Sequence, residues 1–125
     1  MKRIAFLCIK NSCRSQIAEA LCRHLGGERY ICYSAGSDPG DTVDPTAVHL
    51  MQEIYGIDLS THRPKKISDL PKIDIIVTMG CGIACPVVPG TQRIEWHIDD
   101  PVGKDDDAYF QAIAEIEANV KSLIE

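Results

Sequence analysis

The fold of this chain is decided by one stretch near its N-terminus, Ile4-Ala5-Phe6-Leu7-Cys8-Ile9-Lys10-Asn11-Ser12-Cys13-Arg14-Ser15. Residues 4–7 form a short apolar run typical of a buried strand, and from Ser15 onward the apolar residues follow helical spacing. A turn between such a strand and helix can aim several backbone N–H groups and the helix dipole at one point. The sequence therefore predicts an anion-binding loop at this junction.

Two side chains of the stretch, Cys8 and Arg14, suit chemistry on an oxyanion. A cysteine thiolate is a nucleophile, and a positive environment stabilises it near neutral pH. Arg14 presents a planar fork that can grip two oxygens of a tetrahedral anion at once. We therefore expect Cys8 to lie at the base of an oxyanion site. The residues expected to bind the anion are Ile9, Lys10, Asn11, Ser12, Cys13 and Arg14.

Length and composition limit the class of protein. A chain of 125 residues predicts one domain, residues 1–125, without a linker. The net charge of −5 argues against nucleic acid or an anionic membrane as the main partner, because both favour clustered Lys and Arg. The sequence has no stretch long enough to span a bilayer, and its basic start lacks a signal-peptide pattern. We expect a soluble, cytoplasmic protein.

Strand and helix patterns alternate along the chain. Strands are predicted over residues 4–7, 30–34, 73–79 and 93–98. Helices are predicted to begin at Ser15, at Asp44-Pro45 and at the acidic run 105–107, whose charges complement a helix dipole. This alternation predicts an α/β fold with a parallel sheet covered on both faces.

Three segments that carry chemical groups follow predicted strand ends. They contain Cys8 after the first strand, Cys81 and Cys85 after the third, and Asp99 and Asp100 after the fourth. Ligands of parallel α/β folds bind beyond the carboxyl ends of the strands. We therefore expect the three segments to converge on one edge of the sheet.

The six cysteines are expected to differ in role. A cytoplasmic compartment keeps thiols reduced, so chemical roles are favoured over structural disulfides. Cys22 lies in the first helical pattern and Cys32 in an apolar strand, where cysteine usually acts as a small buried hydrophobe. Cys13 is interpreted as a passive loop residue, because the anion site needs only its amide.

The chain resembles the low-molecular-weight protein tyrosine phosphatase fold, and within it the thioredoxin-coupled arsenate reductases. The residues that carry the resemblance are the segment from Cys8 to Glu19, Ser34-Ala35-Gly36, Val77-Thr78-Met79 and the segment from Trp96 to Pro101. The resemblance implies a three-layer α/β sandwich with a four-stranded parallel sheet flanked by helices. The resemblance also implies an enzyme. No cofactor or metal ion is predicted, and a potassium site of some relatives is matched only in part.

The resemblance also assigns roles to individual residues. Cys8 would be the nucleophile, Arg14 and the loop amides would bind the oxyanion, and Asp100 would be the general acid. Asn11 would hold the shape of the loop, and the Ser15 hydroxyl would stabilise the Cys8 thiolate. Asp99, next to Asp100, is the less favoured candidate for the acid.

Reduction of arsenate needs thiols beyond the nucleophile, because a second thiolate must take the sulfur and leave two electrons on arsenic. Cys81 is predicted to attack Cys8, which releases arsenite and forms a Cys8–Cys81 disulfide. Cys85 is then predicted to attack Cys81. Thioredoxin or a similar dithiol would reduce the resulting Cys81–Cys85 disulfide.

Two other functions compete with arsenate reduction. A phosphatase that works through a phosphocysteine needs only the loop and the acid, and a protective Cys8–Cys13 disulfide would suit it. A metal-binding sensor is the minor alternative, because Cys8, Cys13, Cys81 and Cys85 offer four thiolates. Arg14 beside Cys8 opposes a cation there.

Overall fold

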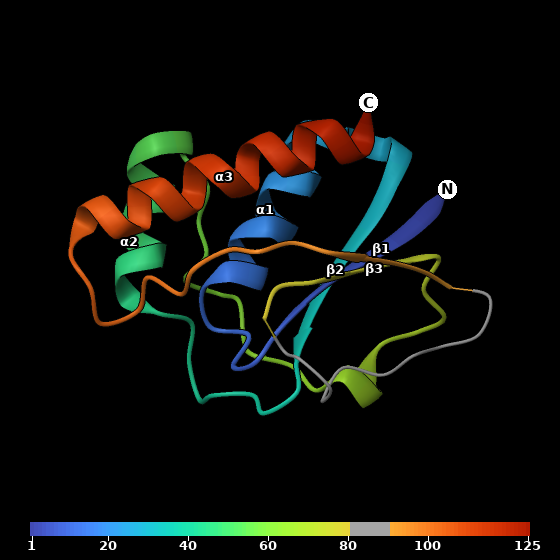
Figure 1. Ribbon diagram of the computed structural model, residues 1–125, viewed down its shortest axis with the longest axis horizontal. Helices are drawn as coiled ribbons and strands as arrows, with labels where there is room; N and C mark the ends of the chain where they lie inside the picture. Colours follow the sequence, from blue (N-terminus) through green and yellow to red (C-terminus); the bar gives the residue numbers. More distant parts are fainter. Residues whose placement is uncertain (81–90) are drawn as a thin grey trace.

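The computed structural model describes residues 1–80 and 91–125. Four strands, all paired in parallel, form one sheet in the order β2-β1-β3-β4 (Figure 1). The strands are β1 (Lys2–Cys8), β2 (Tyr30–Gly36), β3 (Ile75–Thr78) and β4 (Gln92–Glu95). The predicted four-stranded parallel sheet is therefore confirmed, with strand ends that differ from the predicted ones by up to three residues.

The helices follow the predicted order. They are α1 (Arg14–Gly26), α2 (Pro45–Tyr55) and α3 (Asp106–Ile124), with short 3-10 helices η1 (Gly27–Arg29) and η2 (Ile67–Asp69). The Asp44 side chain accepts a hydrogen bond from the backbone N–H of Ala47 and caps α2, and the Asp105 side chain caps α3 in the same way through Ala108. Both predicted helix starts are confirmed by these caps.

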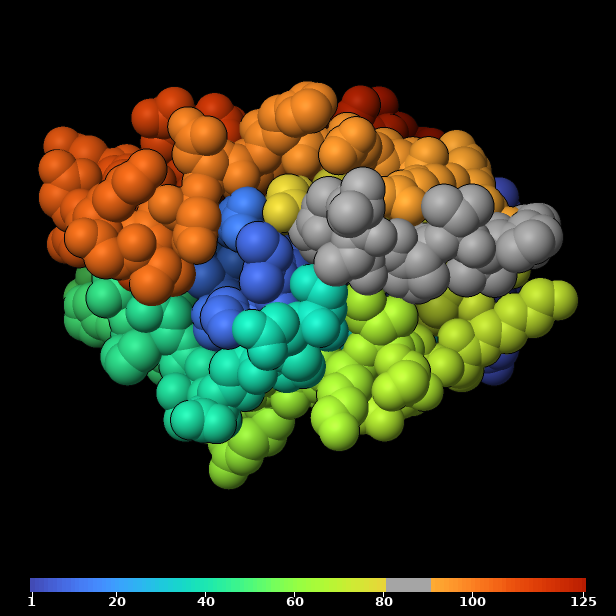
Figure 2. Space-filling view, turned by 60° about the horizontal axis from the view of Figure 1, so that its bottom comes forward, coloured from blue at the N-terminus to red at the C-terminus, as the bar shows by residue number. Residues whose placement is uncertain are grey.

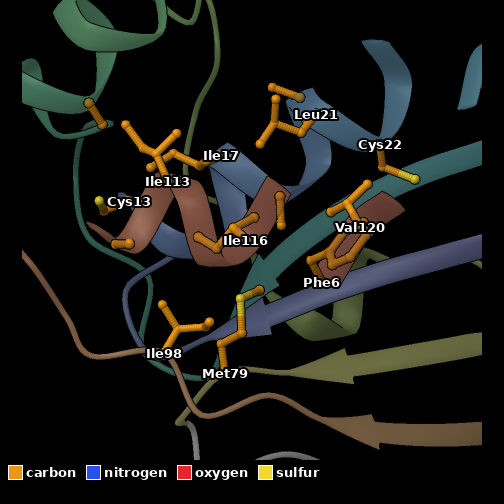
Figure 3. Packing of buried hydrophobic residues seen from close by; sticks show 14 of the residues in the cluster. Phe6, Cys13, Ile17, Leu21, Cys22, Met79, Ile98, Ile113, Ile116 and Val120 are labelled. Atoms are coloured by element: carbon orange, nitrogen blue, oxygen red, sulfur yellow. The ribbon is translucent and has the colours of Figure 1, made fainter. Parts of the chain in front are cut away.

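The side chains of β1 divide the core into two clusters because they alternate between the faces of the sheet. Ile4 and Phe6 belong to the larger cluster, which α1, α2 and α3 complete. Figure 3 shows Phe6 from the sheet, Ile17 and Leu21 from α1 and Ile116 from α3 within this cluster. The long helices thus cover one face.

The opposite face of the sheet has a thinner cover. Ala5 and Leu7 point into a smaller cluster, which Ile67 of η2 and Leu70 close from outside. The covering segment contains Pro64 and Pro71, which lack the backbone N–H that a continuous helix needs. The layered α/β architecture is confirmed, with a 3-10 turn rather than a long helix on this face.

The register of the sheet aligns the strand ends that matter for the site. Cys8 at the end of β1 pairs with Gly36 at the end of β2. Leu7 pairs with Thr78, the last residue of β3. The loops that follow these three strands therefore leave the sheet at the same edge. Across residues 1–80 and 91–125, none of the helices has the length and apolar character that a membrane crossing requires.

Replacement of Ile113 by alanine is expected to destabilise the fold. Ile113 is 3% exposed on the buried side of α3, so the Ile113→Ala variant loses apolar contacts and leaves a cavity, at a cost of about 2–5 kcal/mol. Chemical denaturation measures the loss. Phe110→Ala on the same helix is the control, because Phe110 is 44% exposed, and its cost should stay below about 1 kcal/mol. Equal losses in both variants would contradict this packing.

Candidate active site

Cys8 is buried at the carboxyl end of β1, only 3% exposed. Its Sγ lies 2.8 Å from the Ser15 Oγ. The Asn11 side-chain amide donates a hydrogen bond to the same Ser15 oxygen, at 2.6 Å. Because Asn11 occupies an acceptor site of this hydroxyl, the hydroxyl hydrogen is free to point at Cys8. This arrangement suits a Cys8 thiolate, since a donated hydrogen bond favours the charged form.

Hydrogen bonds to five successive carbonyl groups orient the loop between β1 and α1. The carbonyls of Cys8, Ile9 and Lys10 accept from the backbone N–H groups of residues 37, 38 and 40, at 3.2, 2.9 and 3.0 Å. The Ser12 carbonyl accepts from the Asp44 N–H at 2.8 Å. The Asn11 carbonyl accepts from the Gln16 side chain at 3.1 Å. We call residues 36–44 the supporting segment, because they supply four of the five donors.

The same hydrogen bonds fix the direction of the loop amides. In a trans peptide the C=O group and the following N–H group point in opposite directions, and the described residues contain no cis peptide. The N–H groups that follow the five tethered carbonyls therefore face the other side of the loop. They belong to Ile9, Lys10, Asn11, Ser12 and Cys13, the residues predicted from the sequence to bind the oxyanion.

A cavity of about 200 Å³ lies on that side of the loop. Its volume is enough for a tetrahedral oxyanion with several waters. In Figure 2 the loop (blue) reaches the surface between the supporting segment (turquoise) and the segment near residue 100 (orange). The residues that line the cavity are Cys8, Ile9, Lys10, Ser12, Cys13, Arg14 and Asp100. The structure thus brings the predicted nucleophile, cradle and acid together.

Arg14, the first residue of α1, is held at the edge of this cavity. Its Nη1 donates to the Ile98 carbonyl at 3.0 Å, which fixes the guanidinium plane. Cys13, at the N-cap position of α1, makes no side-chain cap hydrogen bond. The first N–H groups of the helix therefore remain available to an anion, and the helix dipole favours negative charge there.

Asp100 is placed closer to the loop chemistry than Asp99. The Asp100 Oδ2 lies 3.9 Å from the Arg14 Nη2, and its side chain is 54% exposed. Asp99 does not line the cavity above Cys8; it lines a neighbouring depression against α3. The Asp100 Oδ1 also accepts a hydrogen bond from the Val102 N–H, which orients the carboxyl. The geometry favours Asp100 as the acid.

The structure describes the surroundings of Cys13 but not those of Cys81 and Cys85. Cys13 is 2% exposed in the larger core cluster (Figure 3). Burial, with smaller effects of Asp44 and Asp100, raises the pKa of its thiol well above the usual range. This favours the passive role predicted for it. Cys81 and Cys85 lie outside the described residues, and their relay stays a prediction.

The sequence model of the low molecular weight phosphotyrosine protein phosphatase family matches residues 3–125. The chain belongs to this family. The fold, the loop sequence and the family match therefore agree, and the resemblance to the phosphatase fold stated from the sequence is confirmed.

Several relatives of the chain carry the name arsenate reductase. One from Brevibacillus brevis is 40% identical over 130 residues, covering 99% of this chain and 95% of the relative. A glutaredoxin arsenate reductase from Synechocystis sp. is 33% identical over 129 residues, covering 99% and 97%. The solved structure of a thioredoxin-dependent arsenate reductase from Corynebacterium glutamicum has a TM-score of 0.81 and 32% identity. It aligns with 98% of this chain, which spans only 60% of that protein's length. The narrower resemblance to arsenate reductases is thereby confirmed as well.

A buried acidic side chain lies next to the loop of this family member. Glu19 is 2% exposed and forms an ion pair with Arg23 at 2.9 Å. Lys65 approaches the same carboxylate at 3.8 Å, and the Ser34 hydroxyl donates to it. The carboxylate is therefore already neutralised by side chains of this protein. Within residues 1–80 and 91–125, no cluster of three His, Cys, Asp or Glu suits a metal ion.

Sequence reasoning missed one residue that holds the loop, Gln16, and one contact that ties the supporting segment to α3. Gln16 is fully buried, and its amide bridges both Asn11 oxygens and the Arg63 carbonyl. Asp44, besides capping α2, accepts from the Tyr109 hydroxyl at 2.7 Å, which ties the supporting segment to α3. A glutamine one residue after the loop is the only sequence signal for Gln16. The Asp44–Tyr109 contact joins residues 65 positions apart, and no sequence spacing signals it.

Replacement of Gly36 by alanine is expected to weaken oxyanion binding. A Cβ at Gly36 would lie 2.5 Å from the Ile9 carbonyl oxygen and 3.0 Å from the Asn11 nitrogen. The backbone of the loop must move to admit it, and shifts of about 1 Å in a binding site cost up to about a hundredfold. Titration calorimetry with inorganic phosphate as the probe should show at least a tenfold rise in the dissociation constant.

Gly40→Ala is the matched control for this experiment. A Cβ at Gly40 meets only the Lys10 carbonyl oxygen, at 3.9 Å, an ordinary contact distance. Phosphate affinity should stay within about twofold of the parent protein. If Gly36→Ala also left the affinity unchanged, close packing of the supporting segment would not be what orients the loop.

Proposed function

We propose that this protein reduces arsenate to arsenite, with Cys8 as the nucleophile. The observation that carries the proposal is the position of Cys8 beneath a loop whose five tethered carbonyls direct its amides to one side. Relatives named arsenate reductase support the choice of oxyanion, at 33–40% identity over nearly the whole chain.

In the proposed first step, the Cys8 thiolate attacks arsenic and one arsenate oxygen leaves as water. The loop amides and Arg14 hold the remaining oxygens, where they oppose the growth of negative charge. Asp100 protonates the leaving oxygen, since it lies at the cavity mouth on the side of Arg14. The Ser15 hydroxyl, 2.8 Å from the Cys8 Sγ, stabilises the thiolate before attack.

In the proposed second step, the Cys81 thiolate attacks the Cys8 sulfur. The sulfur–arsenic bond breaks, its electron pair stays with arsenic, and arsenite leaves as a Cys8–Cys81 disulfide forms. Cys85 then attacks Cys81 and frees Cys8. Gly80, the residue before Cys81, supports this order, because a Cβ there would lie 2.9 Å from the Arg14 Nη1. Gly80 therefore lies beside the Arg14 guanidinium, and Cys81 is the first cysteine after it in the sequence.

The proposed cycle ends when an external dithiol reduces the Cys81–Cys85 disulfide. One relative is named as thioredoxin-dependent and another as a glutaredoxin arsenate reductase. We propose thioredoxin or a similar dithiol as the reductant, because a dithiol completes the disulfide exchange within one molecule, whereas a monothiol such as glutathione needs a second molecule. Turnover of arsenate with thioredoxin should exceed turnover with glutaredoxin and glutathione.

Hydrolysis of phosphate monoesters is the second candidate function. The family match favours it, and the loop offers the same donors to phosphate as to arsenate. The two functions separate in one assay pair: arsenate turnover with thioredoxin and thioredoxin reductase, and hydrolysis of an aryl phosphate. Fast hydrolysis together with indifference to arsenate would reject the reductase and establish the phosphatase.

Disulfide mapping after a single turnover tests the relay. Trypsin separates Cys8, in residues 4–10, from Cys81 and Cys85, which share residues 73–93. The Cys85→Ser variant should accumulate a bond between these two peptides, because the second exchange cannot occur. The Cys81→Ser variant should release no arsenite. Arsenite release from Cys81→Ser at the parent rate would rule out Cys81 as the residue that resolves the adduct.

The Asp100→Asn variant tests the acid. An amide cannot donate the proton that the leaving oxygen needs, so the rate constant for the first turnover should fall about a hundredfold. Asp99→Asn removes the same charge at the adjacent position and should stay within about threefold. Rapid-quench measurement of the first turnover gives both values. Equal losses would mean that local charge, rather than proton donation by Asp100, sets the rate.

A further inference from the structure

A second pair of thiols lies in the core, away from Cys8. Cys22 of α1 is completely buried, and Cys32 of β2 is 2% exposed. The Cys22 and Cys32 thiols share a hydrogen bond, and the two sulfurs are 2.7 Å apart. Figure 3 shows Cys22 on the side of α1 that faces β2. At 1.5 Å per residue, Cys22 lies roughly 12 Å along the helix from Arg14.

The contact between these thiols is held in place by its surroundings. Arg23, next to Cys22, donates from its guanidinium to the Cys32 carbonyl at 2.9 Å. One turn earlier on α1, Glu19 accepts from the hydroxyl of Ser34, two residues beyond Cys32. These two polar contacts hold α1 against β2 on either side of the two sulfurs. A bonded sulfur pair is about 2.05 Å apart, so little movement separates these thiols from a bond.

We propose that Cys22 and Cys32 form an internal disulfide on exposure to hydrogen peroxide, as a modification site separate from the nucleophile Cys8. The inference rests on the contact between the two thiols and does not depend on the proposed function. Peroxide is the oxidant that suits the site, because it is small and uncharged while both sulfurs are shielded from solvent.

The chemistry needs only the two thiols and one peroxide. The Cys32 thiolate attacks one peroxide oxygen, which breaks the O–O bond and yields a sulfenic acid and water. The Cys22 sulfur then attacks the sulfenic sulfur, and a second water leaves as the disulfide forms. Two thiols are oxidised by two electrons, and one peroxide is reduced to two waters. Hydrogen bonding with Cys22 lowers the pKa of the Cys32 thiol, and this agrees with Cys32 as the first attacker.

The bond would join α1 to β2 across the connection from residue 22 to residue 32. Such a link restricts the unfolded chain and so stabilises the folded one. The melting temperature should therefore rise by about 5 °C or more for a domain of this size. The Cys8 thiol takes no part in this bond, because the bond joins Cys22 of α1 to Cys32 of β2.

Peptide mapping of the full-length protein tests the proposal. Trypsin places Cys22 in residues 15–23 and Cys32 in residues 30–65, and neither peptide contains another cysteine. The protein is treated with peroxide, blocked with N-ethylmaleimide in denaturant, and digested. We expect these two peptides joined by one disulfide, and free maleimide adducts of both in the untreated sample.

Two results would overturn the proposal. One is recovery of both peptides as maleimide adducts after peroxide has oxidised Cys8. The other is recovery of either peptide as a sulfinic or sulfonic acid without the linked pair. Cys22→Ala and Cys32→Ala are the matched controls, and each should lose the peroxide-induced rise in melting temperature seen in the parent. If the rise in melting temperature persisted in both variants, it would have to come from other thiols. Stabilisation by the Cys22–Cys32 disulfide would then be rejected.

Discussion

The site depends on hydrogen bonds that reach the loop after β1 from outside it. Four backbone N–H groups of the supporting segment, with the Gln16 side chain, bind five successive loop carbonyls. Because each peptide is rigid, every bond on the outer side sets the direction of an amide on the inner side. The anion site is therefore built by a segment that does not line it. The loop has its binding geometry before any ligand arrives, so little ordering entropy is lost on binding.

Asn11 shows how tightly this arrangement is determined. Its φ of 53° is unusual for a residue other than glycine, and its side chain satisfies three separate partners. The amide nitrogen donates to Ser15, while the oxygen accepts from Gln16 and from the Lys65 N–H. These contacts hold the backbone in this left-handed conformation, which asparagine adopts more readily than most other residues. One side chain thereby links the thiol environment of Cys8 to the cover on the far face of the sheet.

The sheet and the central residues of the site could be predicted from the sequence, because both depend on local sequence patterns. Apolar runs mark the strands, and Asp44-Pro45 and the acidic run at 105–107 mark helix starts. Cys8 and Arg14 follow from the strand-to-helix junction. The remaining parts are not local: Gln16 reaches Arg63, and Asp44 reaches Tyr109. The contact of Cys22 with Cys32 was not predicted for a similar reason. Separate sequence patterns place each cysteine in the core, but they do not show that the two sulfurs are in contact.

Lys10 has an effect on ligand capture that follows from its pairing. Lys10 lines the cavity, but its ammonium group is bound to the Asp38 carboxylate, and both side chains are well exposed. The pair leaves no net charge at the entrance of a protein whose total charge is −5. A doubly charged anion is therefore repelled at long range and attracted only when it reaches the loop amides and Arg14. Added salt screens the repulsion, so association should become faster, not slower, as ionic strength rises.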